Sequence, residues 1–138
     1  MSFRIAPALS DENRHFWTGG ADGRLHFLRC QDCAYYIHPP APVCRKCRSI
    51  EIAVEPVEGV GTVISYTVNV HQWTPDITGP YAIIIVELDA QPGLHLTSNL
   101  VGCAQEEARI GMRVDVEFER DGEIYYPVFH PLLATAAR

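Results

Sequence analysis

Polar and apolar positions alternate along three segments of the chain, residues 23–29, 60–70 and 112–119, and each alternation predicts a half-buried β-strand. Residues 81–88 are almost continuously apolar, which predicts a strand buried on both faces, and residues 89–93 follow as a turn. In the segment 60–70 one face is expected to form the core and the other to face water. The expected core face comprises Val60, Thr62, Ile64, Tyr66, Val68 and Val70.

The second half of the chain reads as one β-rich unit. Residues 94–101 are expected to return antiparallel to the apolar strand, residues 105–111 to form one helical turn, and residues 123–130 to form the last strand after an Asp-Gly turn. A long first strand, a hairpin, a short helix and a closing hairpin are the order of a five-stranded OB-fold barrel, here over residues 57–131. A six-stranded meander and an SH3-like barrel would show similar periodicity and stay open as alternatives.

The N-terminal segment predicts a short helix. Ser10 can cap a helix over residues 11–17, and Gly19-Gly20 is expected to end it. A helix of two turns cannot bury two large aromatic side chains within itself, so Phe16 and Trp17 must pack on the body of this chain or on a partner protein. The sequence leaves both possibilities open.

Four cysteines form two C-x2-C pairs separated by ten residues, a spacing that lets two tight turns offer four thiolates to one tetrahedral ion: Cys30, Cys33, Cys44 and Cys47. Three prolines between the pairs exclude a helix, and the segment begins with residues suited to a short strand. This is the plan of a zinc ribbon, with two disulfides as the alternative. We expect structural Zn²⁺, because four thiolates leave no open coordination position for substrate.

Rubredoxin-type iron uses the same ligands but favours glycine after each cysteine pair, where the backbone tends to be left-handed. Ala34 and Arg48 occupy these positions, which favours zinc over iron. His38 is expected to be an ordinary surface histidine, since the cysteines already complete the tetrahedron.

The composition excludes several classes of protein. The chain has 138 residues, 17 acidic against 11 basic, a net charge of -6 and an odd number of cysteines, five. No apolar run approaches the roughly twenty residues of a membrane helix, and the first residues lack the apolar core of an export signal. We therefore expect a soluble, cytoplasmic protein without a disulfide framework.

The distribution of charge argues against a nucleic-acid partner. Residues 24–48 carry a formal +4, which four thiolates and one divalent ion reduce by two, while residues 51–123 carry 13 acids and three bases. An acidic barrel would repel a phosphate backbone. The sequence also lacks a recognisable catalytic constellation, because His71 and His95 are isolated and the acidic run of residues 115–119 fits a solvated strand face.

Over nearly the whole chain the residues resemble the acyl-CoA-associated family of rubredoxin-like zinc ribbon plus OB-fold proteins, catalogued as domain of unknown function thirty-five. The segments that carry the resemblance are Phe16-Trp17-x-Gly19, Gly23-x-Leu25, the two cysteine pairs, Pro39-Pro40, Gly59-x-Gly61-x-Val63-x-Ser65-Tyr66-Thr67, Pro80-Tyr81, Val86-Glu87-Leu88-Asp89, Leu100-Val101-Gly102, Ile110-Gly111-Met112-x-Val114-x-Val116-x-Phe118 and Pro127-x-Phe129-x-Pro131. Ala34 and Arg45 depart from the Gly and Pro that are common in the family.

The resemblance implies a mainly β protein with a short N-terminal helical segment (1–22), a four-cysteine zinc ribbon (23–56) and a five-stranded OB-fold barrel with its tail (57–138). It implies a non-catalytic scaffold subunit that binds a thiolase-fold enzyme, which could be a thiolase, an acyltransferase or a steroid side-chain aldolase, and helps to hold or channel its acyl-CoA. The chain length suggests that any hydratase subunit is a separate chain. An independent acyl-CoA or lipid carrier is the alternative, and neither a nucleic acid nor a membrane is expected as a partner. The residues expected nearest the partner and the CoA are Phe16, Trp17, Arg24, Arg29, Arg45, Lys46 and Arg48.

Overall fold

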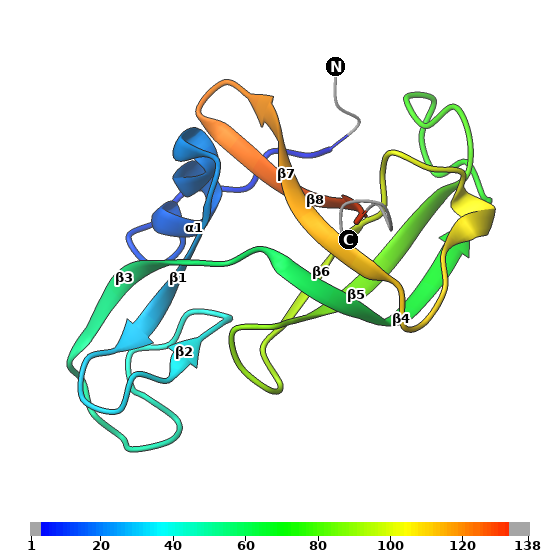
Figure 1. Cartoon of the computed structure of the whole chain (residues 1–138). Helices are drawn as coiled ribbons and strands as arrows, with labels where there is room; N and C mark the ends of the chain where they lie inside the picture. Colours follow the sequence, from blue (N-terminus) through cyan, green and yellow to red (C-terminus); the bar gives the residue numbers. More distant parts are fainter. Residues whose placement is uncertain (1–3, 133–138) are drawn as a thin grey trace.

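The computed structural model describes residues 4–132, and within them the chain is mainly β, as predicted. A short helical segment lies beside a three-stranded sheet, and a five-stranded sheet follows it (Figure 1). No helix in this part of the chain is long and apolar enough to cross a membrane.

The N-terminal helix forms, but it begins later than expected. Helix α1 spans Arg14–Thr18 and continues as a 3₁₀ turn, η1, over Gly19–Asp22, which ends at Gly23 with φ 80°. Ser10 does not cap the helix with its side chain. Instead the Asn13 Oδ1 accepts the Ser10 N–H at 2.8 Å, so the prediction was wrong in both the capping residue and the start.

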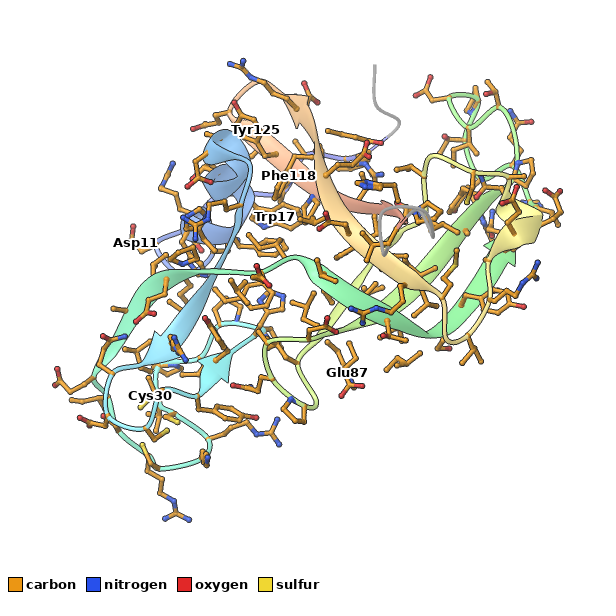
Figure 2. The ribbon with its side chains drawn as sticks, in the orientation of Figure 1. Asp11, Trp17, Cys30, Glu87, Phe118 and Tyr125 are labelled. Carbon is orange, nitrogen blue, oxygen red and sulfur yellow. The ribbon has the colours of Figure 1, made fainter. Side chains whose placement is uncertain are left out.

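Gly20 explains why the paired glycines do not end the helical segment. A Cβ at Gly20 would lie 2.5 Å from Phe118 Cδ2 and 2.7 Å from Tyr125 Cβ, so only glycine lets η1 approach the last two strands this closely. Figure 2 shows Phe118 and Tyr125 beside this segment. The N-terminal segment is therefore docked onto the second half of the chain.

The ribbon sheet has the order β2-β1-β3, and both pairs are antiparallel. Strands β1 (Leu25–Cys30) and β2 (Tyr36–Ile37) confirm the predicted ribbon strands, whereas β3 (Ile52–Val57) was not predicted. Strand β3 pairs with β1 from Leu25↔Val57 to Cys30↔Ile52. It contains Pro56, which weakens a strand signal in the sequence but is tolerated because β3 is an edge strand.

The five-stranded sheet has the order β6-β5-β4-β7-β8, all antiparallel, as an OB-fold requires. The elements match the predicted order, with η2 bridging β6 and β7; they are β4 (Val60–Asn69), β5 (Tyr81–Leu88), β6 (His95–Asn99), η2 (Gln105–Glu107), β7 (Arg113–Asp121) and β8 (Ile124–Pro131). Leu100, the residue after β6, forms one parallel bridge to Phe129 of β8, and the Ser98 hydroxyl of β6 donates to the Pro127 carbonyl at 2.6 Å. Within residues 4–132 no continuous ladder closes the barrel.

Two expectations about buried faces were wrong. At the start of β4 the buried residues are Gly61 and Val63 rather than the even-numbered residues. A bulge between Val63 and Ser65 then exchanges the two faces halfway along the strand. Beyond the bulge Val68 packs against the core again. Strand β5 was expected to be buried on both faces, but fully buried residues alternate with partly buried ones, so only one face is covered completely.

One core joins the N-terminal half to the five-stranded sheet. It includes Phe16 of α1, Leu25 and Phe27 of β1, and Val63 and Phe129 of the five-stranded sheet. A second, smaller cluster surrounds Cys30, Ile37 and Cys44. Strand β1 therefore belongs to the main core at its start and to the cysteine cluster at its end.

Candidate metal centre and interaction surface

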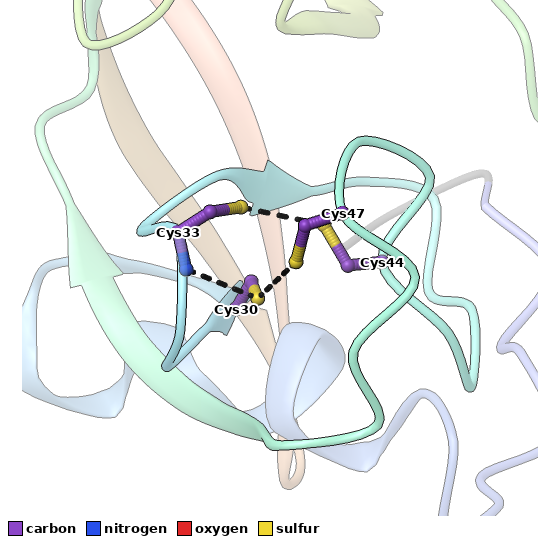
Figure 3. Close-up of side chains that lie close together, drawn as sticks. All are labelled: Cys30, Cys33, Cys44 and Cys47. Atoms are coloured by element: carbon purple, nitrogen blue, oxygen red, sulfur yellow. Dashed lines mark hydrogen bonds between the residues drawn. The ribbon is translucent and has the colours of Figure 1, made fainter.

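The four predicted cysteines converge at the end of the ribbon. Their Sγ atoms all lie within 4.8 Å of one another, and Figure 3 shows that the two pairs face each other across the site. The Cys30 and Cys47 sulfurs are 3.5 Å apart, and those of Cys33 and Cys44 are 3.6 Å apart. Four thiolates about 2.3 Å from a central ion would be about 3.8 Å apart, so the cluster has the size of a tetrahedral metal site.

The two cysteine turns repeat the same backbone geometry. The Ala34 N–H donates to the Cys30 carbonyl at 3.0 Å, and the Arg48 N–H donates to the Cys44 carbonyl at 2.8 Å. Ala34 and Arg48 both adopt left-handed backbone, with φ 68° and 67°. This conformation was expected at both positions, and it strains the backbone because each residue carries a Cβ.

Backbone N–H groups reach the sulfurs of both turns, but only the pKa values of Cys30 and Cys44 are lowered. Burial raises the pKa of Cys33 despite the Tyr35 N–H, and neighbouring thiols with burial raise that of Cys47 to about 12 despite the Ser49 N–H. The Cys33 N–H lies 3.5 Å from Cys30 Sγ and lowers the pKa of Cys30 to about 6, against the opposing effect of burial. Burial raises the pKa of Cys44, but the N–H groups of Cys47 and Lys46 outweigh it and lower the pKa overall. These donors stabilise thiolate, which is the form that binds metal. Four thiolates fill a tetrahedron, so the site can hold an ion but offers no position for substrate.

His38 is not the surface histidine that was expected. Its ring stacks on Phe27 at 4.2 Å and 6° and on Phe16 at 4.9 Å and 30°. Burial, with a smaller effect of His15, lowers its pKa to about 4, so the imidazole is neutral at pH 7. His38 thus connects the loop after β2 to α1 and β1, and it is not among the metal-ligating groups.

The two aromatic residues of α1 have different surroundings. Phe16 is 8% exposed and lies in the main core, whereas Trp17 is half-buried and packs edge-on against Phe16 at 4.8 Å and Tyr126 at 5.9 Å. The side chain of Trp17 is therefore the part of this pair that a second molecule can reach.

The basic residues of the ribbon fall into separate groups. Arg45, Lys46 and Arg48 are exposed beside the cysteines. Arg29 is held within the ribbon, because its guanidinium donates to Glu55 at 3.2 Å and lies 4.3 Å over the Tyr36 ring. Arg24 is exposed just before β1, six residues from Cys30, which corresponds to about 20 Å along a strand. Figure 2 shows Trp17 of α1 well separated from Cys30, which lies at the far end of β1.

The structure also contains a cavity that was not expected from the sequence. This cavity of about 620 Å³ lies between α1, the loop 38–40, β6 and the start of β8, with Arg4 on one side. Its walls come from segments far apart in the sequence. The recognisable signal was the run His38-Pro39-Pro40, whose aromatic and proline surfaces suit a cavity wall.

Comparisons with known proteins agree with this architecture. Residues 17–51 match the family model of the ChsH2 rubredoxin-like zinc ribbon domain, and residues 54–119 match that of the ChsH2 C-terminal OB-fold domain. A solved structure named Ltp2-ChsH2(DUF35) aldolase is 35% identical, with a TM-score of 0.82, over 93% of this chain and 100% of that chain.

Two curated relatives show similar identity. A "Probable enoyl-CoA hydratase alpha subunit" of Thermomonospora curvata is 36% identical over 94% of this chain, and the chain spans 40% of that relative's length. A "DUF35 domain-containing scaffold protein" of Methanocaldococcus jannaschii is 35% identical over 72% of this chain and 74% of the relative. The chain therefore belongs to the DUF35 family, in which a rubredoxin-like zinc ribbon precedes an OB-fold as in ChsH2.

Proposed function

We propose that the protein is a non-catalytic scaffold subunit that binds a thiolase-fold enzyme and helps it to hold a CoA thioester. The observation that carries the proposal is the match to the Ltp2-ChsH2(DUF35) aldolase, which covers all of that chain at 35% identity and a TM-score of 0.82. The methanogen relative is itself named a scaffold protein. A similarity of this extent supports a common mode of assembly, with the partner enzyme supplying the catalytic residues.

The metal has a structural role in this proposal. Cys30, Cys33, Cys44 and Cys47 hold one Zn²⁺ and fix the exposed end of the ribbon. Zinc is favoured over iron because Ala34 and Arg48 replace the glycines that iron-binding turns prefer. Metal analysis should find about one zinc per chain. A red, iron-containing protein, or four freely titratable thiols without metal, would contradict this assignment.

Catalysis by the chain itself is not part of the proposal. In residues 4–132 the four cysteines are the only group of three or more His, Cys, Asp or Glu side chains close enough to share an ion, and they leave no open coordination position. The Thermomonospora relative is named a hydratase subunit, but this chain spans 40% of it. The purified protein should therefore show no turnover of CoA thioesters. Hydrolysis or hydration that survives repurification would refute the scaffold role.

Two surfaces are proposed to meet the partner and its substrate. Trp17 presents a partly exposed aromatic face next to Tyr126, and anchors of this kind contribute about 2 kcal/mol or more when an interface buries them. Arg45, Lys46 and Arg48 extend from the metal-binding end and can attract acidic groups or the CoA phosphates. Arg24 stands apart from them, so it contributes to the Trp17 side.

Size-exclusion chromatography tests assembly directly. The chain is run alone, with a thiolase-fold acyl-CoA enzyme from the same organism, and with an unrelated enzyme of similar size. We expect a stable complex only with the thiolase-fold enzyme. Failure to associate with any thiolase-fold enzyme of that organism would refute the proposed function.

Substitution of Trp17 tests the contact surface. Trp17→Ala should weaken partner binding roughly thirtyfold, since about 2 kcal/mol corresponds to that factor, and should leave the zinc content unchanged. Trp73→Ala is the matched control, because Trp73 is 66% exposed on the loop between β4 and β5. Charge reversal by Arg45→Glu with Lys46→Glu should act mainly on the association rate and weaken with salt. Equal effects of the two tryptophan variants would exclude the Trp17 surface.

A further inference from the structure

The cavity beside α1 has the dimensions of a ligand site. Its volume of about 620 Å³ lies within the range of small-molecule pockets, about 300–1,000 Å³. One wall is made of flat apolar or aromatic surfaces from Phe16, Trp17, Pro39 and Tyr126. Strand β6 adds the polar side chains of Thr97, Ser98 and Asn99 to the lining.

The charges around the cavity are already balanced. Arg4 is the only Lys, Arg, Asp or Glu among the described residues that line it. Its guanidinium donates to Glu119 at 3.1 Å and to Asn99 at 2.7 Å, and it lies 5.3 Å over the Tyr126 ring. A phosphate or carboxylate entering the cavity would lose its hydration without gaining an unpaired cation, which is costly.

Apart from Arg4, the polar side chains that line the cavity are hydrogen-bonding groups and not Lys, Arg, Asp or Glu. His38 lines the cavity with its ring packed against both Phe16 and Phe27, and burial lowers its pKa to about 4, so it carries no charge at pH 7. Thr97 on β6 adds an exposed hydroxyl to the lining. These groups can orient a ligand that has one or two oxygen or nitrogen functions.

We propose that, in the free chain, this cavity binds an uncharged, largely apolar ring compound, independently of the metal site. The aromatic and proline side chains of the lining favour an apolar ring, and the pairing of Arg4 with Glu119 disfavours an anionic ligand. The nucleotide part of CoA is therefore not the occupant. The site does not depend on the proposed scaffold role, since the isolated chain forms all of its walls.

A matched pair of fluorescent probes tests the proposal. N-phenyl-1-naphthylamine is an uncharged ring compound, and 8-anilino-1-naphthalenesulfonate is its close analogue with a sulfonate. The variant Trp73→Phe leaves Trp17 in the cavity wall as the only tryptophan of the chain, so quenching of its emission reports binding at this place. We expect saturable quenching by the neutral probe and at least tenfold weaker binding of the sulfonate. No quenching by the neutral probe, or equal affinity for the two, would overturn the proposal.

A cavity-filling variant provides the second measurement. Thr97 is an exposed residue of β6 that lines the cavity, so Thr97→Phe, made with Trp73→Phe, should reduce affinity for the neutral probe at least tenfold. Thr67→Phe is the matched control, because Thr67 is an exposed strand residue on β4 outside the cavity. Equal loss in both variants, or no loss in Thr97→Phe, would place the probe elsewhere. The probe comparison on the parent protein stands even if a variant folds poorly.

Discussion

Replacing Ala34 by glycine should stabilise the protein, although glycine normally weakens a fold. Ala34 has φ 68°, in the left-handed region, where a side chain costs about 1–2 kcal/mol and glycine costs nothing. Glycine adds backbone freedom to the unfolded chain, which costs about 0.5–1 kcal/mol. Ala34 is exposed, so its methyl group contributes little burial. The net gain in the free energy of unfolding is about 0.5–1 kcal/mol.

The matched control is the same substitution where the backbone is not strained. Ala53 is exposed on strand β3 and pairs with Arg29, so Ala53→Gly adds the entropic cost without relieving any strain. It should lower the free energy of unfolding by about 0.5–1 kcal/mol. The two variants have identical compositions, and their stabilities should differ by about 1–2 kcal/mol.

Urea unfolding of the zinc-loaded protein measures the two free energies. Zinc competition with a chelator gives a second readout, because folding of the turn and metal binding are coupled. A gain of about 0.5–1 kcal/mol corresponds to about two- to fivefold tighter zinc binding in Ala34→Gly. If Ala34→Gly destabilises the protein as much as Ala53→Gly does, the argument from backbone strain is wrong.

Three further predictions test the metal site, the buried histidine and the docking of η1. Cys44→Ser should abolish stoichiometric zinc binding, whereas Cys103→Ser should retain it. Metal analysis of both variants measures this, and zinc retained by Cys44→Ser would contradict the four-cysteine ligand set. Because the pKa of His38 is about 4 in the folded protein and near 6.5 when unfolded, the unfolded chain binds the proton first, so stability should fall by up to about 3 kcal/mol as pH drops from about 6.5 to 4. His38→Phe should flatten that part of the pH–stability curve, and an unchanged slope would refute the assignment. Gly20→Ala should lower the free energy of unfolding, measured with urea, by about 1–3 kcal/mol because its Cβ meets Phe118 and Tyr125. Gly79→Ala has open space around it and should leave this free energy nearly unchanged. Equal effects of the two variants would refute the tight contact at Gly20.

Strands whose residues alternate regularly were predictable, and those with a local irregularity were not. Strand β7 matched its predicted segment closely because nothing interrupts its alternation. In β4 the extra residue at the bulge near Ile64 exchanges the two faces, and a strictly periodic reading cannot show where that happens. Strand β3 was missed because Pro56 is acceptable only on an edge, and strand order is not visible in the sequence.

The candidate sites divide in the same way. The cysteine cluster could be predicted because each pair sits in one local turn, and short-range spacing determines which sulfurs can share an ion. The position of His38 could not, because its stacking partners Phe16 and Phe27 come from two other elements. The cavity was missed for the same reason, since its walls combine α1, the loop after β2, and strands of the five-stranded sheet.

Strand β1 determines how the proposed surfaces depend on the metal. Leu25 and Phe27 anchor its first half in the main core, and Cys30 ends it in the separate cysteine cluster. Loss of the metal would therefore release the exposed turn that carries Arg45 and Lys46, while Trp17 and the cavity remain supported by the main core. The metal thus shapes the charged end of the ribbon, and apolar packing shapes the aromatic end, so one short chain can present two contacts with separate physical origins.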